Sequence, residues 1–393
     1  MQGATNVIAK AAFCTCLLLV AALAAVGESK RENQKRCVSS DPDTIIAGCT
    51  ALIQAGREST ASLVVAYSRR ASAYMRKADY DRAIQDYGDA IRLNPNDASA
   101  YSDRGNAYFY KGDYDRAIQN HDDAIRLNPN FASAYTGRGG AYFVKGDRER
   151  AIQDFNEAIR LNPNEVIAYT SRGVVYIDKG DYDRAIQDYD DAIRLNPNYG
   201  YAYYNRGNAY FEMADYGRAI NDLNEAIRLN PKFAEAYYNR GDAYLLQSNL
   251  TAAMADFEHV ISAEPSSSMA AYAALMLHVA MKRQGRDDAP QLAPVAQAAD
   301  LSQWPGPLLK LDLGQMAADE VMAAAANSDA NLQKRQVCEA NYFTGEDALL
   351  DNQPATALTR FKAARDGCPK GLIGYAEALA ELRRLGVPDA TVN

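Results

Sequence analysis

The sequence predicts an all-α protein, an α-solenoid of stacked helix pairs with a helical cap at each end. The segment Arg-Leu-Asn-Pro recurs at a constant interval of 34 residues, and alanines and tyrosines keep the same interval. A fixed period of this length indicates a repeat architecture, in which each unit buries its apolar face against its neighbours. The positions in step are Pro95, Pro129, Pro163, Pro197, Pro231 and Pro265; Ala83, Ala117, Ala151, Ala185, Ala219 and Ala253; and Tyr74, Tyr108, Tyr142, Tyr176, Tyr210 and Tyr244.

Each unit is predicted to form two helices. Between residues 64 and 77, Tyr67, Ala71 and Tyr74 recur at spacings of three and four, which indicates a helix with one apolar stripe. Later units continue with Lys-Gly-Asp, where glycine ends the first helix in the left-handed conformation and aspartate caps the second. Pro95 stops the second helix because proline cannot continue the hydrogen-bond ladder. Helices of about 14 residues are marginal alone, so the pairs must stack.

Composition excludes several classes of function. The net charge of −8 opposes binding to nucleic acid or to an anionic membrane surface. Three histidines and six scattered cysteines leave little material for catalysis or for a zinc site. No nucleophile elbow, phosphate-binding glycine loop or HExxH pair occurs. We therefore expect no catalytic residues, no metal and no cofactor.

The N-terminus predicts export. Lys10 precedes the apolar run 11–26, and small residues around Ala24 offer a cleavage site, which is the layout of a secretory signal peptide. The run is shorter than the ~20 residues that a membrane-spanning helix needs. We expect a periplasmic or secreted mature protein without an integral membrane span. The alternative is an uncleaved N-terminal anchor that leaves the same domain facing the periplasm.

Four cysteines remain after cleavage, and they fall into two local pairs, Cys37 with Cys49 and Cys338 with Cys368. An even number in an exported chain predicts two disulfides. Each would contribute roughly 3 to 4 kcal/mol in the chain-entropy treatment and would fasten one end of the array. The alternative is four buried free thiols.

The segments before and after the six repeats do not follow the 34-residue period. Before them, we expect a helix over 44–54, with Asp41 as its candidate cap and Pro42 in its first turn. Residues 286–307 contain four prolines and predict a connecting stretch. The predicted divisions are a signal peptide (1–24), an N-terminal capping helix (25–63), six repeats (64–267), a degenerate helical and connecting segment (268–335), a further hairpin (336–371) and a C-terminal capping helix with tail (372–393).

The repeat resembles the tetratricopeptide repeat (TPR) across 64–267. The resemblance rests on the order of tyrosine, a small residue (at 105, 139 and 173), alanine, an aromatic residue and proline in each unit. The resemblance implies a right-handed superhelix whose first helices line an extended groove. Asparagine can pair with both N–H and C=O of an extended backbone, and aromatic faces accept apolar side chains. We therefore predict a peptide-binding groove, whose residues (the predicted groove residues below) are Asn106, Phe109, Tyr110, Phe143, Thr170, Tyr204, Asn205, Asn208, Phe211, Tyr238, Asn239 and Asp242.

Two other repeated features are predicted to be structural. Arginines such as Arg70 and Arg138, where many TPR proteins carry leucine, recur beside periodic aspartates such as Asp86 and Asp154, which predicts a ladder of ion pairs. His121 stands at a position that is aromatic in other units, so we expect it to be a core residue and not a ligand.

The C-terminal part resembles the NlpI-type bacterial envelope adaptors, which are usually lipid-anchored and dimeric. The likeness rests on Trp304-Pro305, on 311–314, on Tyr342-Phe343 with Gly345, and on 381–386, although no lipid-attachment cysteine is present. We predict an exported, non-enzymatic scaffold that binds an extended segment of a protein partner, such as a cell-envelope enzyme. The alternatives are an NlpI-like adaptor for peptidoglycan hydrolase turnover, and a structural spacer or homodimer without a groove ligand.

Overall fold

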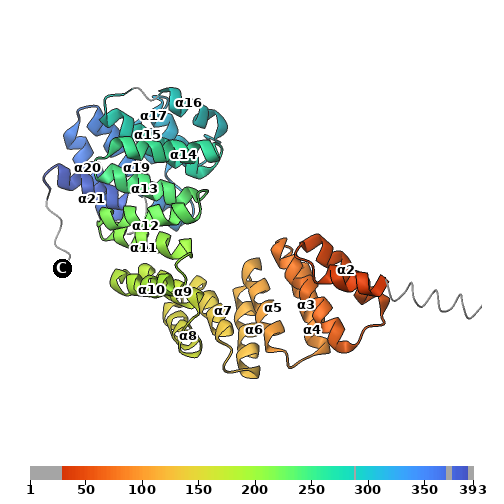
Figure 1. The fold of residues 1–393 in the computed structure, drawn as a ribbon. Helices are drawn as coiled ribbons and strands as arrows, with labels where there is room; N and C mark the ends of the chain where they lie inside the picture. The colour runs from red at the N-terminus through yellow and green to blue at the C-terminus, as the bar shows by residue number, and fades with distance from the viewer. Residues whose placement is uncertain (1–28, 287–288, 369–373, 388–393) are drawn as a thin grey trace, which may run out of the picture. The chain divides into compact units, whose positions relative to one another are not determined.

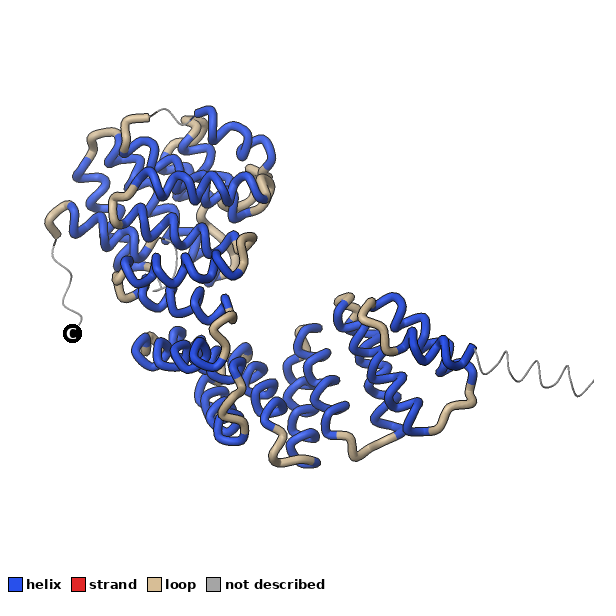
Figure 2. The backbone as a smooth tube through the Cα atoms, in the orientation of Figure 1, coloured by secondary structure: helices blue, strands red, loops and turns tan. Residues whose placement is uncertain are grey.

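The computed structural model describes residues 29–286, 289–368 and 374–387, and within these ranges it contains helices and loops but no strand (Figures 1 and 2). The all-α prediction is therefore confirmed. The chain divides into two compact units, 1–175 and 176–393. The predicted signal peptide, residues 1–24, lies outside the described residues.

The first unit is a series of helices in which each packs on the next (Figure 1). Residues 29–37 are helical and precede α2. The following helices are α2 (Pro42–Ala55), α3 (Thr60–Arg76), α4 (Tyr80–Leu93), α5 (Ala98–Lys111), α6 (Tyr114–Leu127), α7 (Ala132–Val144) and α8 (Arg148–Leu161), and α9 (Val166–Asp178) crosses the division at 175.

The second unit continues the pairs and then adds less regular helices (Figure 1). These are α10 (Tyr182–Leu195), α11 (Gly200–Glu212), α12 (Tyr216–Leu229), α13 (Ala234–Leu246), α14 (Leu250–Ala263), α15 (Ser268–Arg283), α16 (Ala289–Ala298), α17 (Gly306–Asp312), α18 (Ala318–Ala324), α19 (Ala330–Leu350), α20 (Pro354–Gly367) and α21 (Tyr375–Arg384). The predicted connecting stretch 286–307 thus contains α16 and the start of α17, and Pro294 lies inside α16.

The turn inside each pair forms as the sequence predicts. Gly112 adopts a left-handed conformation, with φ of 88°, and ends α5. Asp113 then caps α6, where its carboxylate accepts a hydrogen bond from the Arg116 backbone N–H at 3.1 Å. Arg116 folds back over the ring of Tyr108, 4.6 Å from its centroid. This arrangement of aspartate, arginine and tyrosine recurs from pair to pair, so the arginine joins the cap of the second helix to the last turn of the first.

Small residues lie where the two helices of a pair approach most closely. Ala117 and Ala151 are fully buried, as are the alanines at the equivalent positions. A Cβ atom added to Gly139 would lie 2.9 Å from the ring of Phe155, which is closer than real Cβ contacts. The aromatic side chain of the second helix therefore fills the space that glycine leaves on the first, and this pairing sets the interhelix distance.

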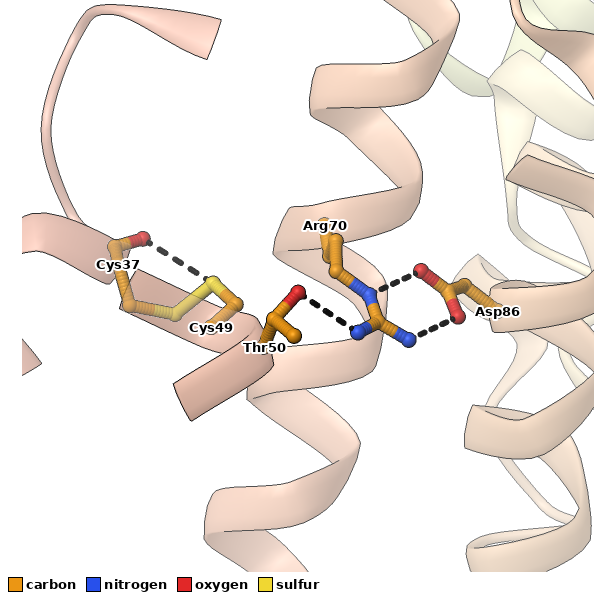
Figure 3. Close-up of a disulfide and its surroundings, with 5 residues drawn as sticks. All are labelled: Cys37, Cys49, Thr50, Arg70 and Asp86. Carbon is orange, nitrogen blue, oxygen red and sulfur yellow. Dashed lines mark hydrogen bonds and ion pairs between the residues drawn. A yellow bond between two sulfur atoms is a disulfide. The ribbon is translucent and has the colours of Figure 1, made fainter. Parts of the chain in front are cut away.

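The predicted cysteine pairs are joined in the structure. Cys37 bonds to Cys49 with S–S of 1.94 Å, and Cys338 bonds to Cys368 with S–S of 1.93 Å. Figure 3 shows that Cys49 neighbours Thr50, whose hydroxyl accepts a hydrogen bond from Arg70 at 2.9 Å. Asp41 caps α2, as predicted, by accepting from the Thr44 N–H at 2.8 Å. The first disulfide thus ties the helical segment 29–37 to α2, which packs on α3.

Candidate functional site

In the first unit, the predicted groove residues lie on the first helix of successive pairs, α5 and α7. Asn106, Phe109 and Phe143 are half-buried, and Tyr110 is 63% exposed. Phe109 sits edge-on to both Tyr110 and Tyr114, with ring centroids 5.6 and 5.5 Å apart. This packing holds the rings in place while leaving part of their surface open to solvent, which suits them for contact with another chain.

In the second unit, the predicted groove residues of α11 are also half-buried, but two of their polar groups already bind Asn239 of the next first helix, α13. The Asn239 side-chain amide donates to Asn208 Oδ1 at 2.8 Å and to the Tyr204 hydroxyl at 3.3 Å. Asn205 is half-buried too, and Phe211 packs edge-on against Tyr216 with centroids 5.4 Å apart. A ligand at α11 would have to compete with this internal network for the amide groups.

Three predicted groove residues are buried and have little surface for a ligand. The hydroxyl of Thr170 donates to the Val166 carbonyl at 2.9 Å within α9, and the residue is 7% exposed. Tyr238 is 7% exposed and Asp242 is 5% exposed, and Asp242 Oδ1 is buried without a hydrogen-bond partner among the described residues. Tyr238 packs against Phe257 of α14, with ring centroids 5.8 Å apart, and belongs to the large core cluster of the second unit. The groove prediction for Thr170, Tyr238 and Asp242 stays a prediction, and these three are the predicted groove residues that the structure buries.

The arginine ladder is confirmed as a structural feature. Arg138 donates two hydrogen bonds to Asp154, at 2.8 and 2.7 Å, and a third to Asp122 at 2.5 Å. Equivalent two-pronged pairs join Arg70 to Asp86, Arg206 to Asp222 and Arg240 to Asp256. Arg104 instead meets Asn120 at 2.7 Å, because asparagine replaces aspartate in that unit. These guanidinium groups already donate to side chains of the same protein. We therefore do not interpret the ladder as a binding site for an anion.

His121 is a core residue, as predicted. It is fully buried between Gly105 and Gly137, where an added Cβ atom would lie 2.9 and 2.4 Å from the imidazole ring. Its Nδ1 is 3.5 Å from the Ser102 hydroxyl, and its Nε2 has no hydrogen-bond partner. Burial, together with the charge of Arg138, lowers the pKa of His121 to about 4, so the ring is neutral near pH 7.

A buried acidic cluster in the second unit was not predicted. Glu377 and Glu381 of α21 and Glu346 of α19 are almost fully buried, and Arg283 donates to both Glu346 and Glu381. Burial raises the pKa of Glu346 to about 7, although Arg283 opposes the shift. The signal in the sequence is that Glu377 and Glu381 share a helix face with Ala378 and Leu382, so charged residues lie on the apolar side of α21.

No helix in 29–286, 289–368 or 374–387 has the length and apolar character needed to cross a membrane. In the same ranges, no group of three His, Cys, Asp or Glu side chains is placed to hold a metal ion.

Comparison with known proteins identifies the repeat. Models described as TPR repeat match residues 71–110, 173–214 and 207–248, and models described as tetratricopeptide repeat match 102–166, 155–187 and 234–267. Together these matches run from 71 to 267, half of the chain. A search of curated proteins finds no significant match.

Solved TPR structures are similar to parts of the chain. MamA is 28% identical, with 42% of this chain and 96% of that chain covered and a TM-score of 0.37. YrrB, described as a TPR protein with an unusual peptide-binding site, is 25% identical over 48% of this chain and 96% of its own, with a TM-score of 0.39. The Cut9–Hcn1 hetero-tetramer of APC/C is 19% identical over 61% of this chain and 49% of its own, with a TM-score of 0.50, a likeness of fold alone. From its repeat matches, the chain belongs to the tetratricopeptide-repeat family.

Proposed function

We propose that the protein is a non-enzymatic scaffold that binds an extended segment of a partner protein on α5 and α7 of the first unit. The observation that carries the proposal is the exposure of these helices: Tyr110 is 63% exposed, and Asn106, Phe109 and Phe143 are half-buried. Of the other predicted groove residues, Tyr204 and Asn208 on α11 accept hydrogen bonds from Asn239 on α13, and Tyr238 and Asp242 on α13 are buried. The α5 and α7 surface is therefore the best place for a ligand.

The chemistry of this surface selects the kind of ligand. The amide of Asn106 can donate to and accept from a peptide backbone, and Phe109, Tyr110 and Phe143 offer apolar faces to side chains. None of these four residues is charged. The surface therefore favours an extended segment with apolar or aromatic side chains over an acidic tail, whose carboxylates would need cationic partners.

The proposal places the protein outside the cytoplasm. The support is the signal-like N-terminal sequence and the two cysteine pairs at bonding distance, since disulfides persist in oxidising compartments. Within that setting, the partner would be another envelope or secreted protein. A role as an NlpI-like adaptor is a narrower form of the same proposal and requires the partner to be a cell-wall hydrolase.

A peptide selection tests the binding surface. Peptides chosen from a random 12-residue library against the full-length protein are measured against the wild type and a Phe109→Ala/Tyr110→Ala variant. Loss of two central aromatic contacts is expected to weaken binding by tenfold or more. Arg126→Ala on α6, whose side chain is largely exposed and pairs with Asp123, is the matched control and keeps wild-type affinity. Equal affinity of all three proteins would contradict the proposal and favour a spacer or a dimer.

A further inference from the structure

A carboxylate lies on the same face of α5 as residues of the proposed binding surface. Asp103, Asn106 and Tyr110 follow one another at spacings of three and four residues, so they share one face of the helix. Asp103 and Tyr110 are exposed, and Asn106 is half-buried between them. The surface that we assign to the partner segment therefore carries a negative charge two helical turns before Tyr110.

The carboxylate of Asp103 is free to bind a cation. In the part of the chain that the structure describes, Asp103 forms no hydrogen bond and no ion pair. Nearby carboxylates are engaged: Asp97 caps α5 by accepting from backbone N–H groups, and Asp122 pairs with Arg138 at 2.5 Å. The protein thus leaves Asp103 without the counter-charge that it supplies to its neighbours.

The repeat does not require an acidic residue at position 103. The five equivalent positions in the other units, at steps of 34 residues, carry a different residue type in almost every case and never an acid. They are Arg69, Gly137, Ser171, Asn205 and Asn239. The fold of a unit therefore does not explain why an acid stands on this face of α5.

The surroundings of Asp103 disfavour its charge in the free protein. Part of the side chain is open to solvent, but protein atoms exclude water from the rest. This burial, and then the negative charge of Asp97, raises the pKa of Asp103 to about 6. A cation placed beside the carboxylate would favour its ionised form and would oppose both causes.

The neighbouring helix α7 leaves room beside this face of α5. The two helices belong to successive pairs and contact each other (Figure 1). Gly137 and Gly140 of α7 follow Asp103 and Asn106 by 34 residues. A Cβ atom added to Gly140 would lie 3.9 Å from the ring of Phe109, which places this backbone beside the aromatic ring. An extended chain can therefore approach α7 closely at two positions that have no side chain.

We propose that this surface selects a segment with a lysine or arginine side chain, whose cation pairs with Asp103 while a neighbouring apolar side chain packs on Phe109 and Tyr110. The inference rests on the proposed function, because it specifies the ligand of the same surface. Asn106, between the charge and the rings, remains available to the backbone of the segment.

The geometry of α5 sets the spacing of the two side chains in the ligand. The seven residues from Asp103 to Tyr110 span about 10 Å of helix. An extended chain advances about 3.3 Å per residue. The basic residue of the partner segment should therefore stand about three positions from its apolar residue.

Peptide selection on two proteins in parallel tests this chemistry. A random 12-residue library is selected against the full-length wild type and against Asp103→Asn. Peptides from the wild type are expected to carry lysine or arginine about three positions from an apolar residue, and peptides from Asp103→Asn should keep only the apolar residue. Equal enrichment of basic residues on both proteins, or none on the wild type, would overturn the inference.

Fluorescence anisotropy measures the contribution of the charge pair. The probes are the tightest wild-type peptide and its analogues with glutamine or glutamate at the basic position. Asp103→Asn should weaken the basic peptide about tenfold and leave the glutamine analogue unchanged, because only the charge pair is lost. Asp103→Lys should instead prefer the glutamate analogue. Asp123→Asn on α6 removes the same charge elsewhere and, as the matched control, should keep wild-type affinities.

The Phe109→Ala/Tyr110→Ala variant separates this inference from the proposed function. If it weakens the basic peptide and the glutamine analogue while Asp103→Asn weakens neither, the surface binds the segment but Asp103 does not select a cation, and the inference is wrong. If the aromatic variant binds both peptides as tightly as the wild type, the segment binds elsewhere and both proposals fail.

Discussion

The buried His121 is expected to lower the free energy of unfolding. His121 occupies a position that is Tyr87, Phe155 or Tyr189 in other units, and its Nε2 is buried without a partner. We expect His121→Phe to raise the free energy of unfolding by about 1 to 2 kcal/mol at pH 7, since an unsatisfied polar atom is replaced by apolar surface. Urea unfolding followed by circular dichroism measures the change.

The same substitution has a predictable pH dependence. Burial lowers the pKa of folded His121 to about 4, whereas an unfolded histidine titrates near 6.5. The unfolded state therefore binds more protons between these values, and stability falls by up to about 1.4 kcal/mol per pH unit as the pH is lowered through that range. The advantage of His121→Phe should grow between pH 7 and pH 5. An identical difference at both pH values would show that the ring is not buried as described.

The arginine ladder can be tested at its best-connected member. Replacing Arg138 with leucine leaves the buried Asp154 without its two donors, which should lower the free energy of unfolding by about 3 kcal/mol. In the Arg138→Leu/Asp154→Leu double variant, both charges are gone, and stability should return to within about 1 kcal/mol of the wild type. Additive losses in the double variant would argue against a direct pair.

At the scale of the element, one turn between paired helices contains a residue whose replacement should stabilise the protein. Ala214 adopts a left-handed conformation, with φ of 58°, where Gly146 and Gly180 stand in other units. We expect Ala214→Gly to stabilise the protein by about 1 kcal/mol, because glycine has no Cβ to clash there. Gly146→Ala is the converse variant and should destabilise by a similar amount. Thermal unfolding of both proteins measures the pair of effects, and shifts in the same direction would contradict the turn geometry.

The N-terminal disulfide is expected to act locally on α2. Cys37→Ser/Cys49→Ser removes the link between 29–37 and α2, and the chain-entropy treatment puts its contribution at about 3 kcal/mol. Hydrogen exchange should therefore quicken in α2 and much less in α5. The Cys338→Ser/Cys368→Ser variant is the control and should leave α2 unchanged. Equal loss of protection in α2 and α5 would show that the link supports the whole unit.

Prediction from sequence succeeded where local chemistry decides the structure. The positions of Gly112 and Asp113, the stop at Pro95 and the pairing of Arg138 with Asp154 all follow from the repeat, because each depends on residues within one or two helices. The burial of Tyr238 and Asp242 could not be predicted in this way. Tyr238 lies in a core cluster with residues of α15, α17 and α19, which come after the sixth repeat and outside its period.

At the scale of the whole molecule, the two units use the same repeat differently. In the first unit, α5 and α7 keep Tyr110 and half-buried aromatics accessible. In the second, α15 is mostly buried, and Tyr238 and Asp242 of α13 are buried too. Burial of apolar surface stabilises the second unit. The first unit keeps accessible surface on its repeats, which a partner can contact. This division is why the proposed scaffold function is assigned to the first unit.

Site-specific photo-cross-linking tests the central claim most directly. A benzoylphenylalanine is placed at position 110, at position 143 or, as the control, at the exposed position 126 on α6, in the full-length protein made in the cell that produces it. The account predicts that positions 110 and 143 capture the same extended segment of one partner protein and that position 126 captures none. Capture from all three positions alike, or only of a second copy of this chain, would contradict it.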